Sequence, residues 1–119
     1  MGLVGPLLRS KKPEERTLYG LRTNETHKNA IGTVHGGVIT SFLDQVIALA
    51  AWNAADRQPT VTIQMDTRFL SAAKTGDFLK ARAEIRQATG TLMFVDADVY
   101  CDEKSIACAT AVLKIIRHA

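Results

Sequence analysis

A single carboxylate stands in a long uncharged stretch of this 119-residue chain, nine residues after the start of a His-Gly-Gly sequence. The stretch reads GTVHGGVITSFLD from Gly32 to Asp44, and Asp44 is the only formally charged side chain between Lys28 and Asp56. Removing a carboxylate from water is costly, so its presence in an apolar segment suggests a chemical task. A carboxylate can act as a general base or as a nucleophile toward a carbonyl carbon.

Two glycines that precede this carboxylate supply a second chemical feature. Gly36 and Gly37 stand where a helix is predicted to begin, so their N–H groups have no acceptor within that helix. They lie at the positive end of the helix dipole and could stabilise a developing oxyanion. Glycine also lets a ligand approach the backbone closely, because it has no Cβ. The alternative is that the pair only makes a tight entry from loop to helix.

The apolar residues after Gly36 recur at helical spacing and predict a largely enclosed helix. Asp44 falls on the one narrow stripe of polar and small residues. The distance from Gly36 to Asp44 is about 12 Å along a straight helix, at about 1.5 Å per residue. One helix alone therefore cannot bring this pair to the same carbonyl group. The apolar positions are Val38, Ile39, Phe42, Leu43, Val46, Ile47, Leu49 and Ala50.

Four later segments alternate apolar and polar residues and predict strands at 60–70, 77–87, 92–101 and 106–118. Short turns join them, which favours an antiparallel meander. One apolar helix and one curved sheet can bury each other, which gives an α+β architecture in which the sheet wraps the helix. We expect a single domain over 17–119 and an N-terminal arm over 1–16. A short helix is expected at PEERTLYG, residues 13–20.

Composition and charge narrow the function classes. The formal net charge is +3, and the excess lies in residues 1–35, which carry six Lys or Arg against three Asp or Glu. This distribution favours a solvated arm over a nucleic-acid-binding face. Two cysteines make no disulfide framework, and neither a signal peptide nor a continuous apolar span of membrane length is visible. We expect a cytoplasmic protein that binds neither nucleic acid nor membranes.

Over roughly residues 17–117, the chain resembles the hotdog-fold acyl-CoA thioesterases. It is most similar to the small single-domain branch that includes the phenylacetate-pathway enzymes and the 4-hydroxybenzoyl-CoA thioesterases. The likeness rests on N-x-x-G-x-x-H-G-G from Asn29 to Gly37, on Asp44, and on FLSAAKTGDFLKARAEI from Phe69 to Ile85. His-Gly-Gly alone would be a weak motif, but the combination is specific. It implies hydrolysis of an aryl- or medium-chain acyl-CoA to coenzyme A and a carboxylate, without cofactor or metal.

The resemblance also implies a homodimer with active sites at the interface, and a dimer of dimers is common in the family. Asp44 would come from the neighbouring subunit, as general base or nucleophile, and the Gly36 N–H would be the oxyanion donor. Asn29 offers an amide to the carbonyl or to water, or else caps a loop. His35 more often orders the loop or lines the site than does chemistry. Thr62 matches a hydroxyl position near the acid, or is an ordinary strand residue.

Coenzyme A requires cations for its phosphates and an apolar slot for its pantetheine arm. Gly37 would contribute to substrate binding beside Gly36. Four cations are candidates for the phosphates, although each one alone is better explained as a solvated surface residue: Arg68, Lys74, Arg82 and Arg86. The acyl pocket has three apolar candidates that could instead belong to the core: Phe42, Trp52 and Met65.

Two other functions fit the same fold. A non-catalytic acyl-CoA-sensing module would not need the Asn29, Gly36 and Asp44 set, and no pair of DNA-binding helices is evident. A hotdog hydratase or dehydratase usually has a His a few residues after the acid. Here no His follows Asp44 until His118. Thioester hydrolysis is therefore the preferred interpretation.

Overall fold

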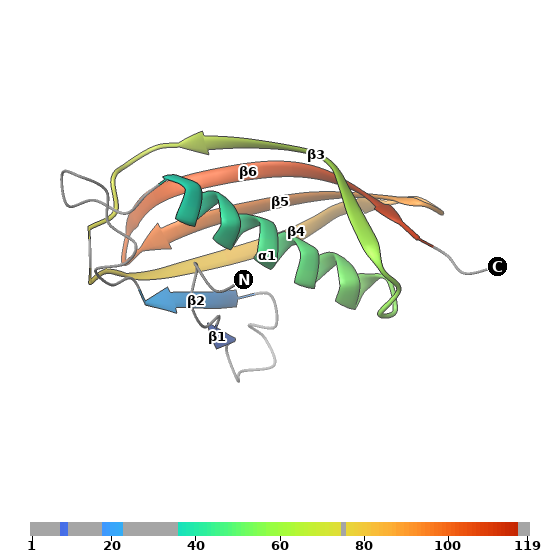
Figure 1. The fold of residues 1–119 in the computed structure, drawn as a ribbon, viewed down its shortest axis with the longest axis horizontal. Coiled ribbons are helices and arrows are strands. Elements are labelled where there is room, and N and C mark those ends of the chain that lie inside the picture. The colour runs from blue at the N-terminus through green and yellow to red at the C-terminus, as the bar shows by residue number, and fades with distance from the viewer. Residues whose placement is uncertain (1–7, 10–17, 23–35, 75, 117–119) are drawn as a thin grey trace.

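The computed structural model describes residues 8–9, 18–22, 36–74 and 76–116. One long helix, α1 (Gly36–Ala54), lies across one face of a curved antiparallel sheet (Figure 1). This arrangement confirms the predicted α+β architecture with a long central helix wrapped by a sheet. The strands are β1 (Leu8–Arg9), β2 (Leu18–Arg22), β3 (Thr60–Phe69), β4 (Phe78–Ala88), β5 (Leu92–Cys101) and β6 (Lys104–Ile115).

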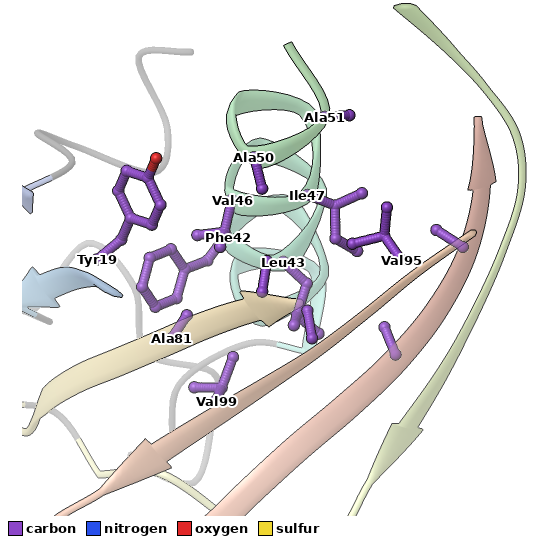
Figure 2. Close-up of a cluster of buried hydrophobic side chains, with 14 of the residues drawn as sticks. Tyr19, Phe42, Leu43, Val46, Ile47, Ala50, Ala51, Ala81, Val95 and Val99 are labelled. Atoms are coloured by element: carbon purple, nitrogen blue, oxygen red, sulfur yellow. The ribbon is translucent and has the colours of Figure 1, made fainter. Parts of the chain in front are cut away.

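The core lies between α1 and the inner face of the sheet. Phe42, Leu43, Val46 and Ile47 are completely buried, and Figure 2 shows them directed from the helix toward the strands. The sheet contributes every second residue of its strands, because successive side chains point to opposite faces. The buried residues of β4, β5 and β6 that meet the helix include Leu79, Ala81, Ala83, Met93, Val95, Ala97, Val99, Ala107, Ala109, Ala111 and Leu113.

The order of strands in the sheet is β1-β2-β4-β5-β6-β3. The prediction of a four-strand meander was therefore wrong for β3, which pairs with β6 and not with β4. Alternation predicts a strand, but it does not say which strand is the neighbour. In β3 it also failed to predict the buried side, because the register shifts after Thr62 and the apolar Val61 and Ile63 are exposed. The connection over residues 70–77 crosses the ends of β5 and β6, whereas the β4–β5 and β5–β6 turns are tight hairpins.

The segment at 18–22 is a strand, so the short helix predicted at 13–20 was wrong for its last three residues. Tyr19 and Leu21 stand two residues apart and are both buried on the core side, a spacing that only an extended chain allows. β2 pairs with β4, and Leu8–Arg9, within the predicted arm, pairs with β2. Residues 13–17 lie outside the described residues.

Among the described residues, one helix, α1, is long and apolar enough by composition to cross a membrane. Its apolar side chains lie against the sheet, and seven of its residues are buried. Packing against the sheet accounts for that composition, because a helix enclosed by protein must be apolar over most of its circumference.

Candidate functional site

The side of α1 that faces away from the sheet carries a line of residues at helical spacing. We call this line the open stripe: Gly37, Ser41, Asp44, Ala48 and Trp52. Ser41 is half-buried and the other four are exposed. Within the described residues, Asp44 makes no hydrogen bond or ion pair. Its carboxylate is thus available to a ligand, to water or to a second chain.

The helix begins at Gly36, and its first N–H groups have no intrahelical acceptor. Neither Gly36 nor Gly37 has a positive φ, unlike Gly76 with a φ of 96°. A Cβ added at Gly37 would meet nothing within 4 Å among the described residues. The φ angles at the start of α1 thus do not require glycine at these two positions. The alternative of a tight turn therefore lacks the strained φ that would demand glycine.

Phe69, at the end of β3, is a site residue that sequence reasoning did not single out. Its ring atom Cζ lies 3.4 Å from the position that a Cβ would occupy at Gly36. The ring is nevertheless 54% exposed. Phe69 is part of the FLSAAKTGD run, so the motif contained it, but only the fold shows that it lies against the start of α1. It forms an apolar wall beside the proposed oxyanion donor.

Thr62 lies on the helix side of β3, because it is opposite Leu113, whose side chain is buried in the core. Its own side chain is exposed, and the register of β3 shifts just after it, between Thr62 and Gln64. Of the three acyl-pocket candidates, Phe42 is completely buried in the core, Met65 is half-buried against the core, and Trp52 is on the open stripe.

The four predicted phosphate-binding cations divide into two groups. Arg68, Arg82 and Arg86 lie on the face of the sheet opposite to α1. Lys74 lies in the β3–β4 connection, five residues after Phe69 and so at the end of the sheet where α1 begins. Lys104 also reaches this end, where its Nζ donates a hydrogen bond to the Ala72 carbonyl at 2.8 Å. Lys74 is thus in the connection that follows Phe69, the neighbour of Gly36, whereas the three arginines lie on the other face of the sheet.

Two other predicted site residues, Asn29 and His35, lie outside the described residues. Gln45 follows Asp44, and its side-chain oxygen is buried without a hydrogen-bond partner among the described residues. Such an oxygen costs about 1–3 kcal/mol if it stays unsatisfied. A donor from beyond the described part of the chain would therefore stabilise the middle of α1, where Gln45 lies.

The part of the chain that the structure describes contains no second candidate site for metal or thiol chemistry. No group of three or more His, Cys, Asp or Glu side chains is placed to hold a metal ion there. Cys101 and Cys108 are unpaired and half-buried, and burial is the main cause that raises the pKa of the Cys101 thiol. A thiol with a raised pKa is a poor nucleophile near neutral pH.

Two curated relatives illustrate the sequence similarity. The Pseudomonas aeruginosa protein PA0474, which is named as an esterase, is 27% identical over 116 residues, covering 97% of this chain and 87% of the relative. Human acyl-coenzyme A thioesterase 13 is 30% identical over 84 residues. That match covers 71% of this chain and 60% of the human protein, so this chain corresponds to only part of that relative's length.

Solved structures share the fold. The BH2602 protein of Bacillus halodurans, whose crystal structure contains CoA, superposes with a TM-score of 0.80 at 21% identity, covering 88% of this chain and 70% of that one. The PaaI protein from the E. coli phenylacetic acid degradation operon has a TM-score of 0.78 at 20% identity, with coverage of 86% and 73%.

These likenesses confirm the hotdog fold. The family model of the thioesterase superfamily matches residues 31–108, which include the start of α1, Asp44 and all of β3, β4 and β5. This chain therefore belongs to the thioesterase superfamily.

Proposed function

We propose that this protein hydrolyses an acyl-CoA thioester to coenzyme A and a carboxylate, and that its site forms between two copies of the chain. The observation that carries the proposal is the start of α1. Two glycines that no strained φ requires stand there, with N–H groups that have no acceptor within the helix and with the Phe69 ring beside them. A carboxylate without a partner among the described residues follows on the open stripe. The thioesterase superfamily and an acyl-CoA thioesterase among the relatives supply the reaction class.

In the proposed reaction, the thioester carbonyl oxygen accepts a hydrogen bond from the Gly36 N–H. The helix dipole and that N–H stabilise the negative charge that develops on this oxygen. Asp44 either takes a proton from the attacking water or attacks the carbonyl carbon itself. In both routes a carbon–oxygen bond forms and the carbon–sulfur bond breaks, so that the coenzyme A thiol leaves and the acyl group becomes a carboxylate.

A homodimer is part of the proposal because of the geometry of α1. Gly36 and Asp44 are about 12 Å apart along the helix axis. Two antiparallel α1 helices related by a two-fold axis near Ser41 would place the Gly36 of one copy beside the Asp44 of the other. Ser41 lies between Gly37 and Asp44 on the open stripe and is small enough for close approach of two helices.

The free edge of the sheet supports the same dimer. β3 pairs only with β6 among the described strands, so its other edge presents unpaired backbone groups. Apolar side chains are exposed along and just beyond it, with Ile63 56% and Leu70 57% exposed. An edge of this kind is a template for pairing with another chain. We propose that a second copy covers it.

The substrate class is an aryl- or medium-chain acyl-CoA. Lys74 and Lys104 lie at the end of the sheet where α1 begins and are the best-placed described cations for the coenzyme A phosphates. Asn29 and His35, which precede Gly36 in the sequence, are proposed to add polar groups to the site, and Thr62 a hydroxyl on the helix side of β3. The protein is proposed to act in the cytoplasm, which the two unpaired cysteines support.

The first experiment measures thiol release from aryl, short, medium and long acyl-CoA substrates. Asp44→Asn should lower kcat by about 10²–10⁴-fold, because it removes the base or nucleophile. Glu103→Gln, which changes an exposed carboxylate in the β5–β6 turn, should leave turnover unchanged and serves as the control. If the wild type binds acyl-CoA and releases no thiol, the sensing module is the correct function. Equal turnover in Asp44→Asn would remove this residue from the mechanism.

A mixing experiment tests whether the site is shared between chains. Gly36→Pro removes the proposed N–H donor, and proline is tolerated at the first position of a helix. Asp44→Asn and Gly36→Pro should each be inactive alone. Mixed and allowed to exchange subunits, they should regain activity, because the heterodimer contains one site with an intact Gly36 and an intact Asp44. A site within one chain would stay inactive after mixing.

A further inference from the structure

The half of the open stripe that follows Asp44 differs from the half that precedes it in what the proposed dimer places over it. An antiparallel partner helix that sets its Gly36 beside Asp44 runs from there back along Ser41 and Gly37. Toward the C-terminal end of α1, the partner's helix has not yet begun. Ala48 and Trp52, both exposed, therefore stay uncovered by that helix.

Between Asp44 and Trp52, the open stripe carries only one side chain, the methyl group of Ala48. Residues four apart are neighbours on a helix surface, so Ala48 adjoins Asp44 on one side and Trp52 on the other. Gln45 and Leu49, which flank this part of the stripe, are half-buried. The carboxylate and the indole thus stand at the two ends of a short surface that an alanine keeps low.

The turn that follows α1 holds the Trp52 ring at the end of this surface. Asp56 and Arg57 have φ angles of 52° and 62°, in the left-handed region that residues other than glycine rarely adopt. This turn lets the Arg57 N–H donate a hydrogen bond to the Trp52 carbonyl oxygen at 2.8 Å. It also places the Arg57 guanidinium 5.5 Å from the centroid of the indole. Strained backbone is concentrated at ligand sites, and here the strained residues position an exposed aromatic ring.

We propose that the acyl group of the substrate lies along the open stripe from Asp44 over Ala48, and that the Trp52 ring sets the longest acyl group that the site accepts. This inference rests on the proposed function and specifies its substrate. The carbonyl carbon is held between Asp44 and the partner's Gly36. The acyl group extends toward Trp52, because the partner's helix covers the stripe in the other direction. The methyl group and the indole are apolar, so they favour an apolar acyl group over water.

The spacing of Asp44 and Trp52 limits the length of this acyl group. The two residues are about 12 Å apart along the helix axis, at about 1.5 Å per residue. Van der Waals contact with the ring takes about 3.5–4 Å of this distance and leaves about 8 Å. An extended carbon chain, with bonds of about 1.5 Å and angles of about 111°, advances about 1.25 Å per bond, so about six bonds fit beyond the carbonyl carbon.

The substrate class that follows is an acyl group of up to about eight carbons, either a straight chain or one aromatic ring on a short linker. A longer chain meets the Trp52 ring before its carbonyl carbon reaches Asp44. Trp52 is therefore a specificity-determining residue, Ala48 is the surface over which the chain lies, and Arg57 is a positioning residue that acts through the ring.

Thiol release by the full-length protein from saturated substrates, from butyryl-CoA to tetradecanoyl-CoA, tests this limit as a profile of kcat/KM against chain length. The wild type should be at least about tenfold poorer with dodecanoyl-CoA than with octanoyl-CoA. Trp52→Ala should remove this difference, and Ala48→Leu should move the optimum to shorter chains. Arg57→Ala should broaden the profile less than Trp52→Ala does. Phe94→Ala, which truncates a half-buried ring on the face of the sheet opposite to α1, should keep the wild-type profile and is the matched control.

The direction of each shift decides the outcome. Opposite shifts in Trp52→Ala and Ala48→Leu support the inference, since a damaged fold lowers turnover at every chain length and cannot lengthen the preferred chain. A wild type that releases thiol, with a profile that neither substitution changes, overturns the inference and leaves the proposed function in place. Absence of thiol release from every substrate instead counts against the proposed function itself, on which this inference rests.

Discussion

The two sides of the nineteen-residue helix α1 obey different constraints. The side against the sheet carries Phe42, Leu43, Val46 and Ile47, all completely buried. The open stripe on the other side carries two residues that lower helix stability or avoid burial, Gly37 and Asp44, and an exposed Trp52. Burial explains the first side completely. Residues that folding does not explain are concentrated on the second, which is where we place the chemistry.

The largest effect on folding should come from the buried side. Phe42→Ala removes a fully buried ring and should lower the free energy of unfolding by about 3–5 kcal/mol. Trp52→Ala, on the open stripe, removes a side chain that is 39% exposed and whose ring centroid lies 5.5 Å from the Arg57 guanidinium. That substitution should cost at most about 1 kcal/mol. Denaturant titrations of both variants measure the difference. Equal losses in the free energy of unfolding would contradict the proposed difference between the two sides of α1.

The next effect concerns the dimer on the open stripe. Ser41→Arg places a bulky cation at the proposed two-fold axis, where it would meet its own copy. We expect the dissociation constant of the proposed helix-mediated dimer to rise by at least about tenfold and activity to fall with it, since like charges brought together cost several kcal/mol. Ala48→Arg, two turns along the same stripe, is the matched control for association. Sedimentation and thiol release at matched dilutions measure both. If the two substitutions had equal effects on the dissociation constant, the two-fold axis would not lie near Ser41.

At Gly37 a substitution should affect catalysis and leave folding stability almost unchanged. Gly37→Ala puts a methyl group into space that is open among the described residues. Stability should stay constant or rise by up to about 1 kcal/mol, because alanine favours a helix over glycine. Turnover should fall, since the methyl group obstructs the approach of the substrate. Gly90→Ala, in the β4–β5 turn, has equally open surroundings and should change neither quantity. Unchanged turnover in Gly37→Ala would place the substrate elsewhere.

The smallest effect is expected at Asp98, on the face of the sheet opposite to α1. The raised pKa of Asp98 in the folded protein means that folding favours its protonated form. Its stabilising contribution is complete below the unfolded pKa and is lost as the pH rises through the folded value. Asp98→Asn should therefore be slightly more stable than the wild type at pH 7, by a few tenths of a kcal/mol after solvent screening. The gain should vanish below about pH 4. Melting in dilute protein at both pH values measures it.

Several parts of the molecule could be predicted from the sequence, because they depend on short-range periodicity. The apolar spacing after Gly36 indicated α1, and alternation over 60–70, 77–87, 92–101 and 106–118 indicated four strands. It also indicated the buried sides of β4, β5 and β6, but not that of β3, where a register shift follows Thr62 and the apolar Val61 and Ile63 are exposed. The Gly36, Gly37 and Asp44 pattern pointed to the start and the exposed side of one helix. The strand at 18–22 was missed, because PEERTLYG also contains helix-starting residues and only pairing with β4 decides for an extended chain.

What the sequence by itself determined is local: which segments coil, which extend, and which face of each is apolar. Only the tertiary structure decided that β3 pairs with β6 and that Phe69 lies against Gly36. It also decided that Arg68 and Arg82 lie on the face of the sheet opposite to α1, while Lys74 lies in the connection between β3 and β4. These facts depend on contacts between residues distant in the chain. Alternation is the same for any neighbouring strand, so strand order follows from how the sheet as a whole closes over the helix.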